Sequence, residues 1–238
     1  MILAIETATP HGSVALVSGD SVLAEAALPR GRQASETILS AVDDLLRKTQ
    51  SGPAEVGHVA VSSGPGSFTG LRVGMAAAKG FCFGWRIPIV PVPTLHALAS
   101  RFRPAGMAVC PVLNARKKEV YAAVFSWEDG TCRRHSPDMA ITPGELPGKL
   151  PDGTVFFCGD GAGQYAPLLI ELLGERAVFP PAGEGMPRAG AVGIFAAGLV
   201  LAGDVFSDPR HAVPVYARPP EAELKRREGQ GSSSAPSN

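Results

Sequence analysis

The sequence predicts an α/β fold of two similar lobes, each with the element order β-β-β-α-β-α. Short β-rich runs alternate with longer amphipathic stretches, and this order of elements occurs twice along the chain. The 238 residues, of which 45% are hydrophobic and 18% charged, are enough to bury two cores. The junction between the two copies falls at Arg103-Pro104. We therefore expect an N-terminal lobe over residues 1–103 and a C-terminal lobe over residues 104–212.

The first half opens with a predicted three-stranded antiparallel meander. Its β-rich runs cover residues 1–6, 13–17 and 22–27 and are separated by glycine-containing turns. From about Ser35 to Ser51, apolar residues recur on one stripe, which predicts an amphipathic helix. The remaining elements expected in this half are strand 56–61, helix 68–84, strand 89–92 and helix 94–101.

The order of elements repeats after Pro104. We expect strands at 108–113, 119–126 and 132–135, a turn of helix at 143–146, a strand at 155–158, and helices at 164–173 and 189–202. Two lobes side by side imply a cleft, which is where ligands usually bind. The proline-rich stretch 213–220 predicts a return strap over the surface, and 221–228 a short charged helix. Residues 229–238 predict a disordered tail.

The charge balance excludes a general electrostatic attraction to nucleic acid or to an anionic membrane, because 22 Lys and Arg residues offset 22 Asp and Glu residues. The apolar stretch 189–203 is too short to span a bilayer, and the N-terminal run lacks the basic residues of a secretory signal. The cysteines form no C-x-x-C pair, so free thiols in a reducing compartment are expected. We therefore expect a cytoplasmic protein without a membrane role.

The most informative run is GPGSFTGLRVGMAAAKG at residues 64–80. It joins a strand to a helix on which small residues recur at every fourth position: Gly66, Gly70, Gly74 and Ala78. Three interpretations stay open, namely a turn that cradles an anion, a face that docks another helix, and packing of the helix against its own sheet. The first fits imperfectly. Leu71 and Arg72 follow Gly70 where a Walker A loop needs Lys, and the glycine spacing is one residue too long for a dinucleotide fingerprint.

The chain resembles the TsaB family, the bacterial accessory subunits of the machinery that makes tRNA threonylcarbamoyladenosine. The resemblance is carried by AIETAT at 4–9, GPGSFTGLRVGMAAAKG at 64–80, LNARKKEVY at 113–121, GDGAGQY at 159–165 and PVYARPPEAE at 214–223. These segments span nearly the whole chain. The resemblance implies a two-lobed actin-like, sugar-kinase-like (ASKHA) fold, in agreement with the duplication.

The resemblance also implies partners and a role. Family members bind the catalytic paralogue TsaD and act with the ATPase TsaE, and the complex modifies N6 of adenosine 37 in tRNAs that read codons beginning with A. The chain is then a non-catalytic scaffold that reaches tRNA only through the complex and forms a homodimer when its partners are absent.

Helix 68–84 is the expected docking element, because its small residues allow another backbone to approach closely. The expected partner interface combines this helix with the apolar stripe of the preceding one: Gly70, Leu71, Gly74, Met75, Ala78, Ile38, Val42 and Leu45. On this hypothesis, a bulky residue at Gly74 abolishes partner binding and leaves folding mostly intact.

The cleft carries candidates for a vestigial nucleotide site: Glu6, Thr7, Gly64, Gly66, Ser67, Asn114, Gly159 and Gly161. Asn114 stands where relatives commonly keep an aspartate and has no charge to bind a divalent ion. Glu6 has an alternative role as a cap of the turn after the first strand, and Ser67 as a helix cap. We expect no cofactor on the chain alone, and ATP or ADP with Mg²⁺ only within the complex.

No catalytic or metal-binding constellation is predicted. The five histidines form no H-x-x-x-H pair, and the serines near the glycine run form no G-x-S-x-G elbow. Two alternatives stay open: an autonomous ATP-dependent phosphotransferase of the sugar-kinase type that uses the cleft, and a zinc-dependent glycoprotease-like peptidase, against which the missing histidine pair counts.

Overall fold

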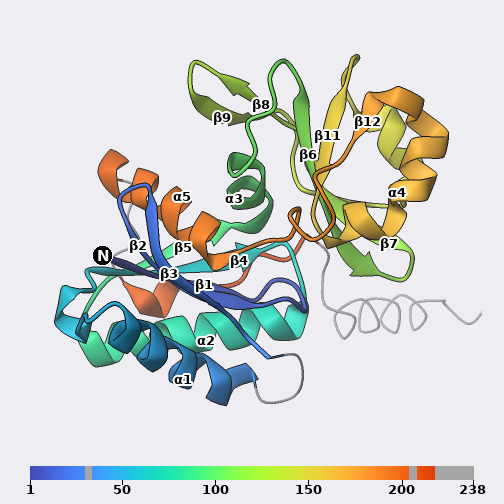
Figure 1. Ribbon diagram of the computed structural model, residues 1–238. Helices are drawn as coiled ribbons and strands as arrows, with labels where there is room; N and C mark the ends of the chain where they lie inside the picture. Colours follow the sequence, from blue (N-terminus) through green and yellow to red (C-terminus); the bar gives the residue numbers. More distant parts are fainter. Residues whose placement is uncertain (30–33, 204–207, 218–238) are drawn as a thin grey trace, which may run out of the picture.

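The computed structural model describes residues 1–29, 34–203 and 208–217, and it contains two sheets with helices around them (Figure 1). The first sheet has the strand order β3-β2-β1-β4-β5. Its strands are β1 (Ile2–Glu6), β2 (Ser13–Ser18), β3 (Ser21–Ala27), β4 (His58–Gly64) and β5 (Ile89–Pro93). The first three form the predicted antiparallel meander, and β4 and β5 continue it in parallel from β1. β4 begins and ends later than expected, because its pairing with β1 starts at His58.

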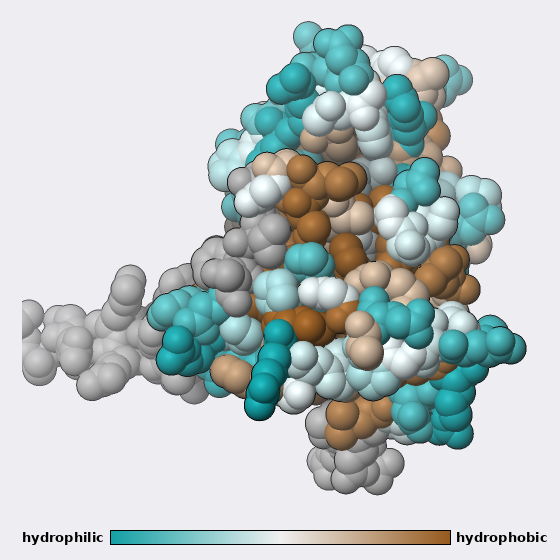
Figure 2. Space-filling model, turned by 90° about the vertical axis from the view of Figure 1, so that its left-hand side faces the viewer, coloured by the Kyte–Doolittle hydropathy of each residue, from teal (hydrophilic) through white to brown (hydrophobic). Residues whose placement is uncertain are grey.

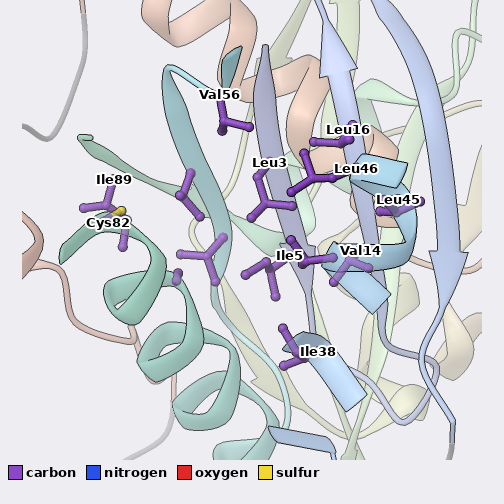
Figure 3. Packing of buried hydrophobic residues seen from close by; sticks show 14 of the residues in the cluster. Leu3, Ile5, Val14, Leu16, Ile38, Leu45, Leu46, Val56, Cys82 and Ile89 are labelled. Carbon is purple, nitrogen blue, oxygen red and sulfur yellow. The ribbon is translucent and has the colours of Figure 1, made fainter. Parts of the chain in front are cut away.

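Two helices cover one face of this sheet. Helices α1 (Ala34–Lys48) and α2 (Phe68–Trp85) pack over alternate residues of the strands, among them Leu3 and Ile5 of β1. Figure 3 shows these side chains gathered with Ile38 of α1 and Cys82 of α2. The period of two along β1 thus directs one set of residues to this core and the other set to the opposite face.

The opposite face is covered by α5 (Ala189–Ala202), which corrects our assignment of this helix to the C-terminal lobe. Its bounds are as predicted, but it packs on β1 and β2. The physical reason is a close approach at Gly193, where an added Cβ would lie 2.5 Å from a methyl group of Val17. The outer side of α5 leaves Leu201 87% exposed. Figure 2, which views the side where α5 lies in Figure 1, shows hydrophobic residues across the middle of that face.

The second sheet follows the path β10-β7-β6-β11-β12, with a hairpin off this path. The strands on the path are β6 (Ala108–Arg116), β7 (Glu119–Ala122), β10 (Met139–Ile141), β11 (Val155–Cys158) and β12 (Ala177–Val178). Helix α4 (Asp160–Leu173) packs on β6 and begins four residues before the predicted helix. Short 3₁₀ helices lie at Pro53–Glu55, Pro143–Lys149, Gly174–Arg176 and Pro209–His211.

The predicted meander of the second half is partly wrong. The single strand expected at 119–126 is two strands, β7 and β8 (Phe125–Glu128), because the chain moves along β6 from Val112 to pair again at Val109. The expected third strand, β9 (Thr131–Arg134), pairs with β8 alone. The third position in the sheet belongs to β10, which the sequence analysis missed.

The lobes meet through α3 (Thr94–Ser100), whose Leu95 and Leu98 join Val109 and Phe125 in one buried cluster. The C-terminal segment returns to the first lobe as the predicted strap. There the Val215 N–H donates to the Ser63 carbonyl at 2.6 Å. Residues 218–220 of the strap, the charged helix at 221–228 and the tail at 229–238 lie outside the described residues. Within the described ranges, every helix falls short of the length and apolar character that crossing a membrane requires.

Candidate functional site

Two glycines of α2, Gly70 and Gly74, serve packing within this chain. An added Cβ at Gly70 would lie 2.0 Å from the Thr7 carbonyl oxygen, and one at Gly74 would lie 2.1 Å from Thr7 Oγ1. Such separations are not tolerated, so these glycines let α2 lie directly on the end of β1. Of the three interpretations of this run, internal helix packing describes the small-residue face.

The structure therefore corrects the role that was expected for the docking residues. Seven of the eight are buried within the first lobe, and Gly70 is half-buried. Leu71, Gly74, Met75 and Ala78 face the sheet, and Ile38, Val42 and Leu45 belong to the same core from α1. These residues are buried because the small side chains allow the end of β1 of the same chain to pack against α2, in the place where a partner was expected.

The first glycine turn is occupied by the chain itself. Gly64 ends β4 with a φ of +125°, and an added Cβ there would lie 2.0 Å from the Val215 carbonyl oxygen of the strap. The Ser67 N–H donates to the Ala8 carbonyl at 2.7 Å, and Ser67 Oγ caps α2 by accepting from the Gly70 N–H at 3.3 Å. These two amide groups have acceptors within the protein, so neither is open to an anion.

Glu6, at the end of β1, is a buried carboxyl group that is 1% exposed. Its Oε1 accepts from the Ala8 N–H at 2.5 Å, as the turn-capping alternative expected. Burial raises the pKa of Glu6 to about 7, and the negative charge of Asp160 acts in the same direction. Beside it, Thr7 Oγ1 is buried and has no hydrogen-bond partner among the described residues.

The second glycine turn lies in the other lobe and has a different chemistry. Gly159 ends β11 with a φ of +105° and lies close to the Val112 carbonyl oxygen. Asp160 then begins α4, and its Oδ1 accepts from the N–H groups of Asn114 at 3.1 Å and Gly161 at 3.0 Å. A carboxylate of the chain thus takes the N–H groups that would otherwise be open to an anion. Burial raises the pKa of Asp160 above its ordinary value.

The nucleotide candidates therefore fall at two turns, one in each lobe. Asn114 supplies a backbone donor to Asp160, and its side-chain amide donates to Gln164 Oε1. Sequence reasoning missed Asp160, although its position between Gly159 and Gly161 signalled a turn residue with a charge. Among the described residues, no group of three or more His, Cys, Asp or Glu side chains is arranged to hold a metal ion.

A groove on the outer face of α1 and α2 lies opposite the buried glycine face. It encloses about 610 Å³ and is lined by Leu39, Arg72, Val73, Ala76, Ala77, Gly80, Phe81, Gly84 and Trp85. The rings of Phe81 and Trp85 lie 4.8 Å apart, and Leu39 is 60% exposed. The recurrence of apolar residues at positions 73, 76, 77, 80, 81 and 84 would have revealed this second face of α2 from the sequence.

A larger cavity of about 1090 Å³ lies away from both turns, beside the β8–β9 hairpin. There Ser126 Oγ lies 2.6 Å from His135 Nε2, and Glu128 Oε1 lies 3.4 Å from the same nitrogen. A Ser-His-acid relay needs the acid on the other imidazole nitrogen, so these residues do not form one.

Comparison with known proteins identifies the family. The chain is 32% identical over 228 residues to the tRNA threonylcarbamoyladenosine biosynthesis protein TsaB of Escherichia coli (strain K12), covering 91% of this chain and 94% of that protein. The chain belongs to the TsaB family. It is also 29% identical over 231 residues to TsaB of Bacillus subtilis (strain 168), covering 96% and 99% of the two chains.

Structural comparison agrees with this assignment. The structure of YeaZ from Pseudomonas aeruginosa superposes with a TM-score of 0.76 at 27% identity, over 90% of this chain and 98% of that one. The chain thus shares the α/β fold of YeaZ, with the two sheets described above. A family model described as TsaD, tRNA N6-adenosine threonylcarbamoyltransferase, matches residues 22–155, which fits a TsaB chain that is a paralogue of TsaD.

Proposed function

We propose that this chain is a cytoplasmic, non-catalytic subunit for tRNA threonylcarbamoyladenosine biosynthesis that docks onto a TsaD homologue through the outer groove of α1 and α2. The groove carries the proposal, since eight of its nine lining residues are apolar or glycine. An exposed apolar surface of this kind is typical of a protein contact. The docking helix is the one that the sequence indicated, but its opposite face is used.

The likeness to TsaD favours a paralogue as the occupant. The matched region, residues 22–155, includes both α1 and α2, so a TsaD homologue carries counterparts of the same two helices. Two related helix pairs can pack face to face about an approximate two-fold axis. We propose the same face for a homodimer when the TsaD homologue is absent, and that TsaE and tRNA join through the complex.

The docking proposal is tested with Leu39→Glu, which places a charge on an exposed groove residue. We expect the affinity for the TsaD homologue to fall at least roughly 100-fold, because a buried unpaired carboxylate opposes docking. Threonylcarbamoylation by the reconstituted complex should fall in parallel. Leu172→Glu is the matched control, since Leu172 is 46% exposed on the second-lobe helix α4.

Ala76→Glu provides a second variant in the groove. Neither substitution alters a buried core residue, so urea unfolding should match the wild type for both. Wild-type affinity in both groove variants would overturn the docking surface.

The non-catalytic part of the proposal is supported by the two turns, which Val215 and Asp160 occupy from within the chain. The isolated chain should therefore show no saturable binding of MgATP in calorimetric titration. Saturable binding with hydrolysis by the chain alone would favour the sugar-kinase alternative instead. We propose that ATP or ADP with Mg²⁺ is engaged only in the assembled complex.

A further inference from the structure

Arg72 is the one charged residue among the nine that line the α1–α2 groove. Its guanidinium is held in place from two sides. The guanidinium carbon lies 3.9 Å from the ring centroid of Phe68, and its Nε donates to Tyr216 Oη at 3.1 Å. The rings of Phe68 and Tyr216 lie 5.0 Å apart. Tyr216 belongs to the C-terminal strap, so the strap orders a side chain of the groove.

The described residues supply no carboxylate to this guanidinium. Arg72 makes no ion pair among them, and α2 contains no Asp or Glu. On α1, the described carboxylates Asp43 and Asp44 both pair with Arg47. A guanidinium that is fixed through Nε and the ring face keeps its two terminal nitrogens for a planar acceptor, and a carboxylate matches that geometry.

We propose that Arg72 receives a carboxylate of the docked TsaD homologue at the end of the groove, and that Tyr216 is a positioning residue that holds Arg72 for this contact. The inference rests on the proposed docking face and adds the chemistry of the partner, an apolar helix surface with an acidic residue at one end. A second copy of the chain fits less well, because α2 has no acid to offer and the described acids of α1 are engaged by Arg47.

The strap contributes to binding because it fixes the Arg72 side chain before the partner docks. A free arginine loses much rotamer freedom when it is fixed in an interface, which weakens binding. Here Phe68 and Tyr216 fix the side chain before the partner arrives. Removal of the Tyr216 hydroxyl should therefore act on the partner only through Arg72.

The test is a double-mutant cycle on the dissociation constant of the complex with the TsaD homologue, using Arg72→Ala, Tyr216→Phe and the pair. Arg72→Ala should weaken binding by about 10- to 100-fold at low salt and reduce the salt dependence. Tyr216→Phe keeps the ring on Phe68 and loses the acceptor, and should weaken binding by about 3- to 10-fold. In the Arg72→Ala background, Tyr216→Phe should have no further effect.

Lys149→Ala is the control, because it removes an exposed positive charge on the second lobe, away from the groove, and should leave the affinity unchanged. Wild-type affinity of Arg72→Ala together with loss of binding in Leu39→Glu would overturn this inference and leave the docking face standing. Wild-type affinity in both Leu39→Glu and Ala76→Glu would instead overturn the docking face itself. A Tyr216→Phe effect that persists without Arg72 would overturn the positioning role. An equal loss of homodimer affinity in Arg72→Ala would make a second copy the occupant and overturn the acidic partner.

Discussion

The two glycine turns at the ends of β4 and β11 share a backbone plan but are closed by different parts of the chain. Both strands end on a glycine with positive φ, +125° at Gly64 and +105° at Gly159. Each turn leads into a helix that lies on the first strand of its own sheet. The first is covered by Val215 of the strap, whereas the second is filled by the Asp160 carboxylate.

The difference shows which features of a duplicated lobe depend on packing and which depend on chemistry. Glycine is kept where a Cβ would meet backbone, so the close approach of helix to strand survives in both lobes. The charged groups differ, because β1 ends with the buried Glu6, whereas its counterpart β6 carries the half-buried, neutral Asn114 near its end. The two carboxyl groups, of Glu6 and Asp160, belong to different lobes, and the charge of Asp160 raises the pKa of Glu6.

The largest effect is expected from matched glycine substitutions in the two helices. Gly70→Ala would place a Cβ 2.0 Å from the Thr7 carbonyl oxygen, while Gly163→Ala in α4 meets nothing within 4 Å. We expect Gly70→Ala to cost about 3 kcal/mol of the free energy of unfolding, through overpacking against backbone. Gly163→Ala should gain about 0.5–1 kcal/mol from helix propensity. Urea unfolding of both variants measures the difference.

A Gly70→Ala variant within about 1 kcal/mol of the wild type would show that α2 can move away from β1. The same geometry corrects the expectation that a bulky residue at Gly74 leaves folding intact, since its Cβ would lie 2.1 Å from Thr7 Oγ1. Gly74→Leu should therefore unfold the first lobe before it reports on any partner.

The next effect is the pH dependence of stability that Glu6 confers on the first lobe. The pKa of its carboxyl rises from 4.5 to about 7 on folding, because burial disfavours the charged form. The folded state therefore binds the proton more tightly, and this stabilisation is complete below pH 4.5 and lost as the pH rises through about 7. The loss amounts to about 3 kcal/mol.

Glu6→Gln tests this sign, because the amide oxygen can still accept from the Ala8 N–H and carries no charge. The variant should be more stable than the wild type at pH 8 by up to about 3 kcal/mol and should lose most of the slope between pH 5 and 8. Glu175→Gln, at an exposed carboxylate, is the control and should keep the wild-type slope. A wild-type protein with flat stability over this range would contradict the assignment.

The same two lobes show what the sequence could and could not predict. Sequence patterns predicted each α-helix of the described chain, and α5 has the bounds expected, Ala189–Ala202. The sequence could not predict which sheet α5 covers, because a helix that is apolar on all sides has no face that points to one sheet rather than the other. The split of residues 119–126 into β7 and β8 depends on where along β6 the chain pairs a second time, which is a tertiary property.

The site was predicted less completely than the fold. The spacing of Gly70 and Gly74 correctly indicated close approach of a backbone, but the sequence did not say whose, and β1 of the same chain takes the place. The outer face of α2 follows the same helical period but was not predicted as a binding surface. The sequence of a helix that is apolar on two faces does not show which face is buried. Asp160 was missed because its role needs Asn114 from another strand.

The smallest expected effect is on the electrostatic interaction between the two turns. Asp160→Asn keeps an oxygen for the N–H groups of Asn114 and Gly161 and removes the charge that raises the pKa of Glu6. The pKa of Glu6 should then fall below about 7, by a fraction of a pH unit, because burial is its larger cause and Asp160 a smaller one. Titration of the Glu6 carboxyl carbon by NMR measures this shift in the folded chain. An unchanged midpoint would mean that the charge of Asp160 does not act on Glu6, and the two turns would then be electrostatically independent.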